Sequence, residues 1–394
     1  MRLYVKIIIS FIVVFLGCKN EESENEKPVF TTTIIQSDIL NEERKILISK
    51  PVSEHSEYFA QKKFPVIYVL DGEDMFHYIS SMVNFLSVTK GNKIFPQTLV
   101  VGIVNTNRSK DLTHEEINFE PDSGGGFLFS NFIENELFKY INENYPVKKH
   151  KTLIGHSYGG LFVLNVLKEN PNLFDNYIAL DPSYQYMQKS TIDLSSQEYH
   201  NKQLYIAIAN TLIKSGSLNY GSSNNHYNSL IELCNQLTAN SNYGIMSHCE
   251  EFKNDDHASL CIDATYKALR KLFSWYKLDI SRPNLENLTE DQIYDKLEFY
   301  NKTLSTQFKE NSYADEEIIY QLANNIDNRK LKHKLLLVNL KNNSESFNAH
   351  YVLGKYHKSM GNMDSTKFYL KEALRIHKDE LTLEELNEIT MGNK

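Results

Sequence analysis

The sequence has too few cysteines and too few basic residues for several classes of protein. Four cysteines in 394 residues cannot build a disulfide scaffold, and no CxxC pair or Cys/His spacing suggests a zinc site. The 42 basic residues are outnumbered by 50 acidic ones, for a net charge of −8, so the basic footprint of a general nucleic-acid-binding protein is missing. Hydrophobic residues make up 41% and charged residues 23%, which is typical of globular proteins, and the length favours two domains.

The first eighteen residues combine a basic start with an apolar run. Arg2 and Lys6 flank the start of the run at 7–16, which is long enough for a signal-peptide core but shorter than the about 20 residues that span a bilayer. The run ends in the letters FLGC, which resemble a bacterial lipobox. We therefore expect a signal peptide and lipobox at 1–18, with cleavage before Cys18 and lipidation of that cysteine. The alternative is an uncleaved N-terminal anchor.

Residues 19–28 form a polar linker in which a lysine is followed by acidic residues. This pattern resembles the surface-export tags of Bacteroidetes lipoproteins. The expected location is the cell envelope, with the chain anchored in the outer membrane through Cys18 and facing outward. Lipidation of Cys18 would leave three thiols that can form at most one disulfide within the chain, and the sequence does not choose among Cys234, Cys249 and Cys261.

Residues 29–280 alternate short β-branched runs with longer amphipathic stretches. Nearly continuous apolar runs predict strands buried on both faces, as in a parallel sheet, at 66–70, 99–104, 152–154 and 204–209. Segments 31–37 and 44–49 alternate in polarity and predict an antiparallel edge. A helical spacing at 127–145 ends at Pro146. The pattern predicts an α/β sandwich with a mostly parallel sheet.

Residues 285–394 predict a small all-α domain. Two related units, one with Leu353-Gly354 and Ala373-Leu374 and a shorter one around 322–340, fall at spacings like those of tetratricopeptide repeats. Two units are fewer than the three or so that such arrays need for independent stability. We therefore expect this domain to dock on the α/β body or to bind a protein partner.

A glycine-rich hexapeptide at 155–160, GHSYGG, lies between a predicted strand and a helix-length apolar run. This context is that of a nucleophile elbow, where a strained turn exposes a serine at the start of a helix. It predicts Ser157 as the nucleophile and the backbone amide of Tyr158 as an oxyanion donor. The competing interpretation is a tight turn with an incidental serine.

The histidine partner of such a serine follows the last strand of the fold. His257 stands in a polar loop between a predicted strand at 244–252 and a closing helix at 260–275. The other histidines considered, His200, His226 and His248, lie at less suitable positions. The sequence therefore predicts His257 as the general base.

Four ordered segments together resemble the esterase D-like esterases, a family that includes siderophore esterases, feruloyl esterases and mycolyltransferases. They are 70–72, 105–113, the elbow at 155–160 and 256–259. The resemblance covers roughly residues 30–276 and implies an α/β-hydrolase fold and ester hydrolysis without specifying a substrate. It also implies that the amide of Glu73 is the second oxyanion donor. Arg108 and Asp111 match the family's loop beside the site, where a structural salt bridge competes with a substrate contact.

The catalytic acid departs from the family pattern. Relatives carry a carboxylate just after the strand at 204–209, where this chain has Asn210 and no carboxylate through Gly221. Asp181 ends the preceding predicted strand and is the hypothesis adopted for the acid. An amide role for Asn210 and a Ser–His dyad stay open.

The leading functional prediction is a serine carboxylic-ester hydrolase acting on a small ester or lactone, with no metal or organic cofactor. Phe76 and Tyr184 are predicted to line a substrate pocket, although core packing is the more common fate of such residues. An acyltransferase or thioesterase would share the chemistry. The alternative from another class is a catalytically weak pseudo-hydrolase scaffold that binds a protein through its helical tail.

Overall fold

The computed structural model describes residues 30–51, 56–88, 94–187, 199–210, 223–239, 244–285 and 287–391. The predicted signal peptide, Cys18 and the linker at 19–28 lie outside the described residues. The strands are β1 Phe30–Ser37, β2 Glu42–Ser49, β3 Phe64–Val69, β4 Leu99–Ile103, β5 Val147–His156, β6 Asn176–Leu180, β7 Gln203–Ala209 and β8 Met246–Phe252. The helices of the body are α1 Gly72–Val88, α2 Arg108–Leu112, α3 Gly126–Phe132, α4 Phe138–Asn144, α5 Tyr158–Glu169, α6 Ser223–Ala239 and α7 Leu260–Leu272.

Within the described part of the chain, these strands form one eight-stranded sheet in the order β1-β2-β4-β3-β5-β6-β7-β8. The strands from β4 to β8 run parallel, which confirms the predicted mostly parallel sheet. β1 pairs with β2, and β2 with β4, in antiparallel fashion, so the predicted antiparallel edge is also confirmed. Parallel strands end at the same edge of the sheet, so the residues that follow β3, β5, β6 and β8 are brought together there.

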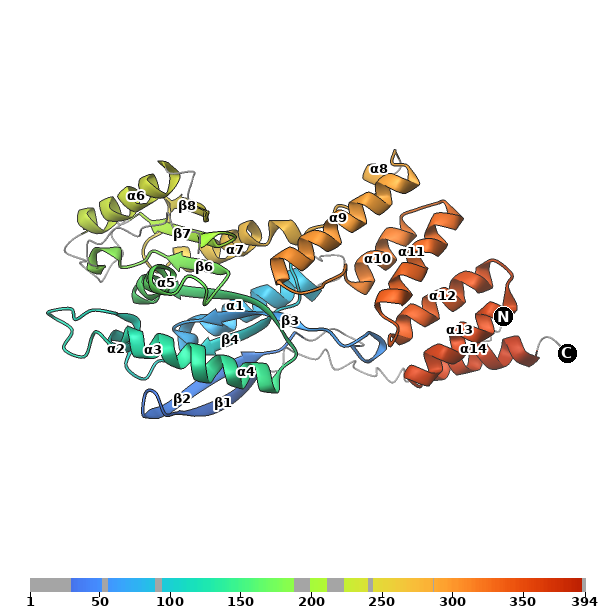
Figure 1. The fold of residues 1–394 in the computed structure, drawn as a ribbon, viewed down its shortest axis with the longest axis horizontal. Coiled ribbons are helices and arrows are strands. Elements are labelled where there is room, and N and C mark those ends of the chain that lie inside the picture. Colours follow the sequence, from blue (N-terminus) through green and yellow to red (C-terminus); the bar gives the residue numbers. More distant parts are fainter. Residues whose placement is uncertain are drawn as a thin grey trace, which may run out of the picture.

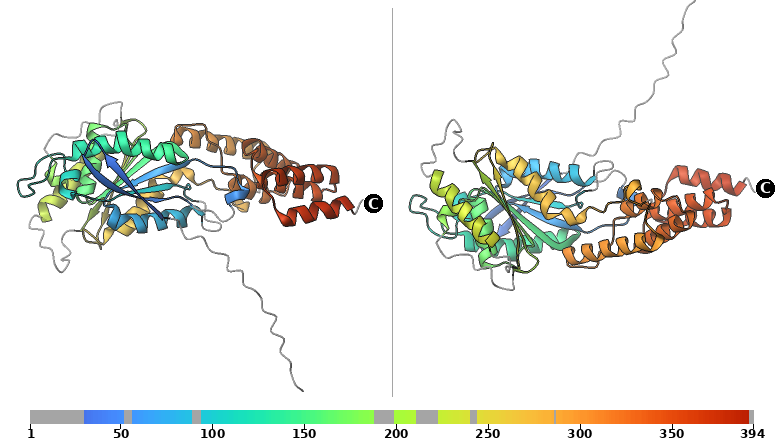
Figure 2. Two further views of the ribbon diagram at one scale, coloured as in Figure 1. Left: turned by 90° about the horizontal axis from the view of Figure 1, so that it is seen from below. Right: turned by 90° about the horizontal axis from the view of Figure 1, so that it is seen from above.

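Helices cover both faces of the sheet, as Figures 1 and 2 show. Along β3, Val66 and Tyr68 pack toward the helices α3 to α5 and α6, whereas Ile67 and Val69 pack toward α1 and α7. This alternation is the two-residue period of a strand, and burial on both faces explains why the strand sequences are nearly continuous apolar runs. The helix predicted at 127–145 occurs as α3, a π-helical turn at Ile133–Leu137 and α4 in succession.

The rest of the described chain is helical. Its helices are α8 Arg282–Leu285, α9 Glu290–Phe308, α10 Glu316–Asn324, α11 Arg329–Asn342, α12 Phe347–Ser359, α13 Met363–Ile376 and α14 Glu380–Met391. They extend from one end of the α/β body and give the molecule an elongated shape (Figure 1). α12 packs against α13, and Gly354 allows their close approach, since a Cβ there would lie 3.0 Å from Leu370. Membership of the tetratricopeptide repeats stays a prediction.

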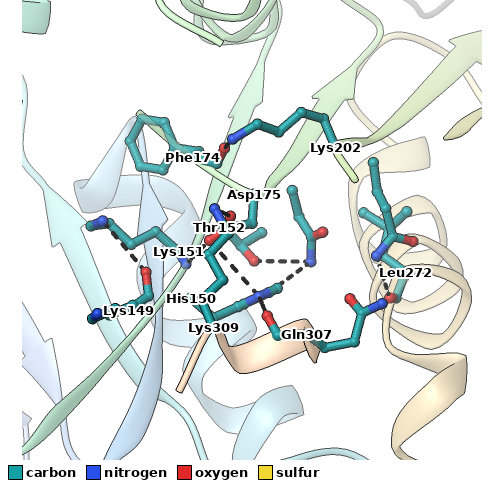
Figure 3. Close-up of polar contacts among 12 residues, drawn as sticks. Lys149, His150, Lys151, Thr152, Phe174, Asp175, Lys202, Leu272, Gln307 and Lys309 are labelled. Carbon is teal, nitrogen blue, oxygen red and sulfur yellow. Dashed lines mark hydrogen bonds and ion pairs between the residues drawn. The ribbon is translucent and has the colours of Figure 1, made fainter. Parts of the chain in front are cut away.

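The helical region docks on the body through a buried polar cluster (Figure 3). Nδ1 of His150 donates to the carbonyl oxygen of Gln307 at 2.8 Å, and the side-chain amide of Asn176 lies 3.2 Å from its Nε2. Lys309, just after α9, forms an ion pair with Asp175. Burial lowers the pKa of His150, in keeping with a neutral ring that donates from one nitrogen and accepts at the other. This contact lies toward the ends where β5 and β6 begin, away from the edge where they finish.

A disulfide joins Cys234 of α6 to Cys249 of β8, and Cys261 is a free thiol. The pairing that the sequence leaves open is thus Cys234 with Cys249. Burial raises the pKa of Cys261 to about 12, so this thiol is a poor nucleophile at neutral pH.

None of the helices among the described residues combines the length and apolar character needed to cross a bilayer.

Candidate active site

Ser157 stands in a strained turn between β5 and α5. Its backbone has φ of 60° and ψ of −116°, a conformation that residues other than glycine rarely adopt. The turn requires glycine on both sides: a Cβ at Gly155 would lie 2.3 Å from the carbonyl oxygen of Gly159, and one at Gly160 would lie 2.9 Å from Pro182. The elbow context predicted from the sequence is therefore present in the backbone.

His257 and Asp181 form a hydrogen-bonded pair beside this turn. Nδ1 of His257 lies 2.5 Å from Oδ2 of Asp181, whose side chain is fully buried. Oδ1 of the same carboxylate accepts the backbone N–H of Ala209 at 3.0 Å. Burial opposes ionisation of Asp181, but the neighbouring rings of His226 and His257 hold its pKa well below the ordinary value. The carboxylate is therefore ionised at neutral pH.

The loop that carries His257 is tied to the elbow and to β7. Nε2 of His156, the residue before Ser157, donates to the carbonyl oxygen of His257 at 2.6 Å. The side chain of Asn210 donates to the carbonyl oxygen of Lys253 at 2.7 Å, and its backbone N–H donates to Asp255. Asn210 thus supports the loop backbone, while Asp181 contacts the ring of His257.

His226, one of the histidines set aside in the sequence, also lies beside Asp181. Its Nε2 is 3.3 Å from Oδ1 of Asp181, and its Nδ1 is 2.7 Å from Oε1 of Gln185. Asp181, His226 and His257 place three potential metal-ligand atoms within 4.8 Å of one another. Two ligands of a tetrahedral zinc ion stand roughly 3.3 Å apart, so the 2.5 Å contact between His257 and Asp181 fits a hydrogen bond better than a metal ion.

Glu73 and Tyr158 each lie in the first turn of a helix, α1 and α5 respectively. Amides there point out of the helix N-terminus, where the dipole favours a negative charge. The side chain of Glu73 is engaged elsewhere, because its carboxylate accepts two N–H groups of Asn105.

Arg108 braces the same edge of the sheet. It binds Asp71 through two hydrogen bonds of 2.7 and 2.9 Å and donates to the carbonyl oxygen of His156 at 3.2 Å. Asp111 instead pairs with buried Arg44 at 2.6 Å. Arg108 and Asp111 thus have separate partners, and both pairs join segments of the fold.

The two aromatic residues predicted to line a pocket occupy different environments. Phe76 is fully buried and packs over Gly102, where a Cβ would lie 2.9 Å from its ring. Its ring belongs to the core cluster beside α1, and a substrate contact for Phe76 stays a prediction. Tyr184 is half-buried against the core, and its role in substrate binding stays a prediction.

Two further residues, Ser183 and Phe119, were not singled out in the sequence. The hydroxyl of Ser183 lies 3.3 Å from that of Ser157. The ring of Tyr186 packs edge-on to Tyr158 at 5.9 Å and to exposed Phe119 at 5.6 Å. The sequence signal for Ser183 is its position two residues after Asp181 in the segment 179–183, ALDPS. No motif or spacing in the sequence indicates that Phe119 lies in this region.

Acid is expected to destabilise the fold through two histidines. Burial lowers the pKa of His114 to about 4, and burial together with the neighbouring His257 lowers that of His156 to about 4. The unfolded chain protonates both rings below about pH 6.5, whereas the folded chain protonates them only near pH 4, so folding stability falls over this window. The loss is at most about 1.4 kcal/mol per pH unit for each ring. Urea unfolding from about pH 7 to about pH 4.5 measures it.

In that series, a His114→Gln variant should show a shallower pH dependence, because one proton fewer is taken up on unfolding. An unfolding free energy that stays constant across the window would contradict the prediction.

Residues 37–259 match the family described as "Putative esterase", which covers more than half of the chain. The ferri-bacillibactin esterase BesA of Bacillus subtilis is 29% identical over 230 residues, which are 52% of this chain and 78% of that protein. The IroE-like serine hydrolase from Shewanella oneidensis has a TM-score of 0.66 at 26% identity and covers 79% of this chain and 99% of its own. An uncharacterised protein from Capnocytophaga ochracea shares the fold, with a TM-score of 0.61 at 20% identity over 92% of this chain and 100% of its own. The chain therefore belongs to the "Putative esterase" family and is a carboxylic-ester hydrolase.

Proposed function

We propose that this chain is a serine esterase that hydrolyses a small ester or lactone through an acyl-enzyme on Ser157. The observation that carries the proposal is the buried Asp181 carboxylate, which lies 2.5 Å from Nδ1 of His257 beside the strained Ser157 turn. In this arrangement the hydrogen of the neutral His257 ring is on Nδ1 and is donated to Asp181, so Nε2 carries no hydrogen and can act as the base.

In the proposed reaction, Nε2 of His257 takes the hydroxyl proton of Ser157 as Oγ attacks the ester carbonyl. The amides of Tyr158 and Glu73 stabilise the oxyanion, because both lie in the first turns of their helices. His257 then returns the proton to the leaving alcohol. Water, deprotonated by His257, hydrolyses the acyl-enzyme and restores Ser157.

We further propose that the substrate is a siderophore ester or lactone with aromatic groups. One relative is named a ferri-bacillibactin esterase, and another, from Aspergillus fumigatus, is named a siderophore triacetylfusarinine C esterase. Tyr158, Tyr186 and exposed Phe119 form a row of rings that begins beside the nucleophile, and the Arg108 guanidinium lies 5.4 Å from the ring of Tyr158. Such rings would pack against planar aryl groups.

A turnover screen of aryl, acyl-sugar and siderophore lactone esters tests the substrate class. Siderophore lactones are expected to give a kcat/KM at least about tenfold above that of acyl-sugar esters. A preference for acyl sugars would contradict the substrate proposal and leave the serine mechanism standing.

Covalent labelling tests the mechanism. A fluorophosphonate should modify the wild-type chain at Ser157, and Ser157→Ala should remove the label. Label that persists in Ser157→Ala, or that never forms in the wild type, would contradict the serine mechanism.

The non-catalytic scaffold is the less favoured function. The scaffold interpretation was supported by the lack of a carboxylate directly after β7. The contact between Asp181 and His257 weakens that support, because Asp181 can take the role of the acid. We retain partner binding by the helical tail as a proposal that is compatible with catalysis.

We also propose that the chain is a lipoprotein of the cell envelope, anchored in the outer membrane through Cys18. The basic start, the apolar run at 7–16 and the FLGC sequence support this. The disulfide between Cys234 and Cys249 is in keeping with an oxidising compartment outside the cytosol. Mass spectrometry of the mature N-terminus would detect the lipid on Cys18, and an unmodified cysteine would contradict the anchor.

A further inference from the structure

We infer that His226 is a positioning residue that donates a hydrogen bond from Nε2 to Oδ1 of Asp181 and so holds the other carboxylate oxygen on His257. This inference rests on the proposed triad. His226 comes from α6, far in sequence from both residues that it would connect.

The surroundings of His226 leave Asp181 as its Nε2 partner. The residue is only 8% exposed, and Nε2 is a buried atom with no closer hydrogen-bond partner among the described residues. Oδ1 of Asp181 lies 3.3 Å away. A buried polar atom without a partner is costly, which favours a hydrogen on Nε2 directed at this carboxylate.

The contact with Gln185 leads to the same conclusion. If the amide oxygen of Gln185 faces Nδ1 at 2.7 Å, Nδ1 carries a hydrogen, and Nε2 carries one too only in the imidazolium form. If the amide is turned so that its NH₂ donates to Nδ1, the neutral ring carries its hydrogen on Nε2. The remaining arrangement, with hydrogen on Nδ1 alone, would set a nitrogen lone pair 3.3 Å from a buried carboxylate oxygen. Both favourable arrangements therefore place a donor on Asp181.

The helix α6 is well suited to hold this donor in place. His226 shares a stripe with Leu230, Leu233 and Cys234, all of which are buried against the core. Cys234 is joined by the disulfide to β8, the strand that precedes His257. His226 and His257 thus approach Asp181 from two elements that are covalently linked.

Two donors and the catalytic ring then share one carboxylate. The backbone N–H of Ala209 and Nε2 of His226 both contact Oδ1 of Asp181, and Nδ1 of His257 contacts Oδ2. An aspartate directly after β6 must reach across to a histidine after β8, and contacts on its second oxygen would prevent the carboxylate from rotating away. His226 acts on the reaction through Asp181 and is not itself a catalytic residue.

The test measures kcat and KM of the full chain in five variants, one of which is Asp181→Asn alone. His226→Ala should lower kcat by about 10- to 100-fold with KM within about twofold, because a charge-assisted hydrogen bond is lost. His226→Gln, whose amide nitrogen can occupy the place of Nε2, should stay within about fivefold of the wild type. Leu233→Ala, also on the buried stripe, should lower the melting temperature while kcat stays within about twofold. Asp181→Asn/His226→Ala should be no slower than Asp181→Asn alone.

The outcomes separate the two proposals. If Asp181→Asn keeps the wild-type kcat, the triad itself is wrong. If Asp181→Asn is slow but His226→Ala matches the wild type, only the role of His226 is overturned. The role of His226 is also overturned if His226→Gln is as slow as His226→Ala, or if Leu233→Ala lowers kcat as much as His226→Ala does.

Discussion

Replacing Asp181 with asparagine is expected to lower kcat by about 10⁴-fold with little change in KM. The amide cannot stabilise the imidazolium that forms when His257 takes the serine proton, and its NH₂ group favours the wrong tautomer of the ring. Asp181 is fully buried and contacts both His226 and His257, so the substitution removes the carboxylate that lies between the two rings.

Asn210→Ala is the matched comparison, because Asn210 follows β7, where the family resemblance implies the acid. Its side chain donates to the carbonyl oxygen of Lys253, so its removal should loosen the loop and lower kcat by less than about tenfold. A loss above about 10³-fold in Asn210→Ala, with a mild effect in Asp181→Asn, would move the acid role to Asn210. Melting temperatures of both variants would show whether a loss of activity reflects unfolding.

Replacing Ser157 with alanine is expected to lower kcat by about 10⁵- to 10⁶-fold, since the attacking oxygen is removed. Alanine has the same Cβ as serine, so the turn at the positive φ of Ser157 should be kept while only the hydroxyl is removed. The residual rate reports what the oxyanion donors and substrate binding contribute without the nucleophile.

Ser183→Ala is the control for this variant. The hydroxyl of Ser183 lies 3.3 Å from that of Ser157, so Ser183 is the alternative nucleophile to exclude. Its loss should cost about one hydrogen bond, or less than about tenfold in kcat. A variant series in which Ser183→Ala abolishes turnover and Ser157→Ala does not would assign the nucleophile to Ser183.

Local patterns in the sequence predicted the sheet and the elbow. Strands such as β3 and β7 are buried on both faces, so their sequences are apolar throughout and stand out from the polar connections. The elbow at Ser157 has its own glycine pattern, because a Cβ at Gly155 would overlap the backbone of Gly159. The edge pair β1 and β2 alternates in polarity, which is the expected pattern of a strand with one exposed face.

The acid and its second partner depend on packing that no local pattern encodes. Whether Asp181 reaches His257 is set by the positions of β6 and β8 in the sheet and by the turn after β6. His226 approaches from α6, whose placement follows from its apolar stripe and from a disulfide that the sequence left unassigned. The burial of Phe76 depends on packing too, because its position near Glu73 does not tell which side of α1 faces β4, where Gly102 makes room for the ring.

Trapping the acyl-enzyme tests the central claim most directly. The full chain is mixed with a slowly hydrolysed aryl ester, quenched in acid before one turnover is complete, and digested for mass spectrometry. The acyl mass is expected on the peptide that contains Ser157, and its rate of appearance should fall about 10⁴-fold in Asp181→Asn. Turnover without an acyl adduct, or an adduct on any residue other than Ser157, would contradict the mechanism.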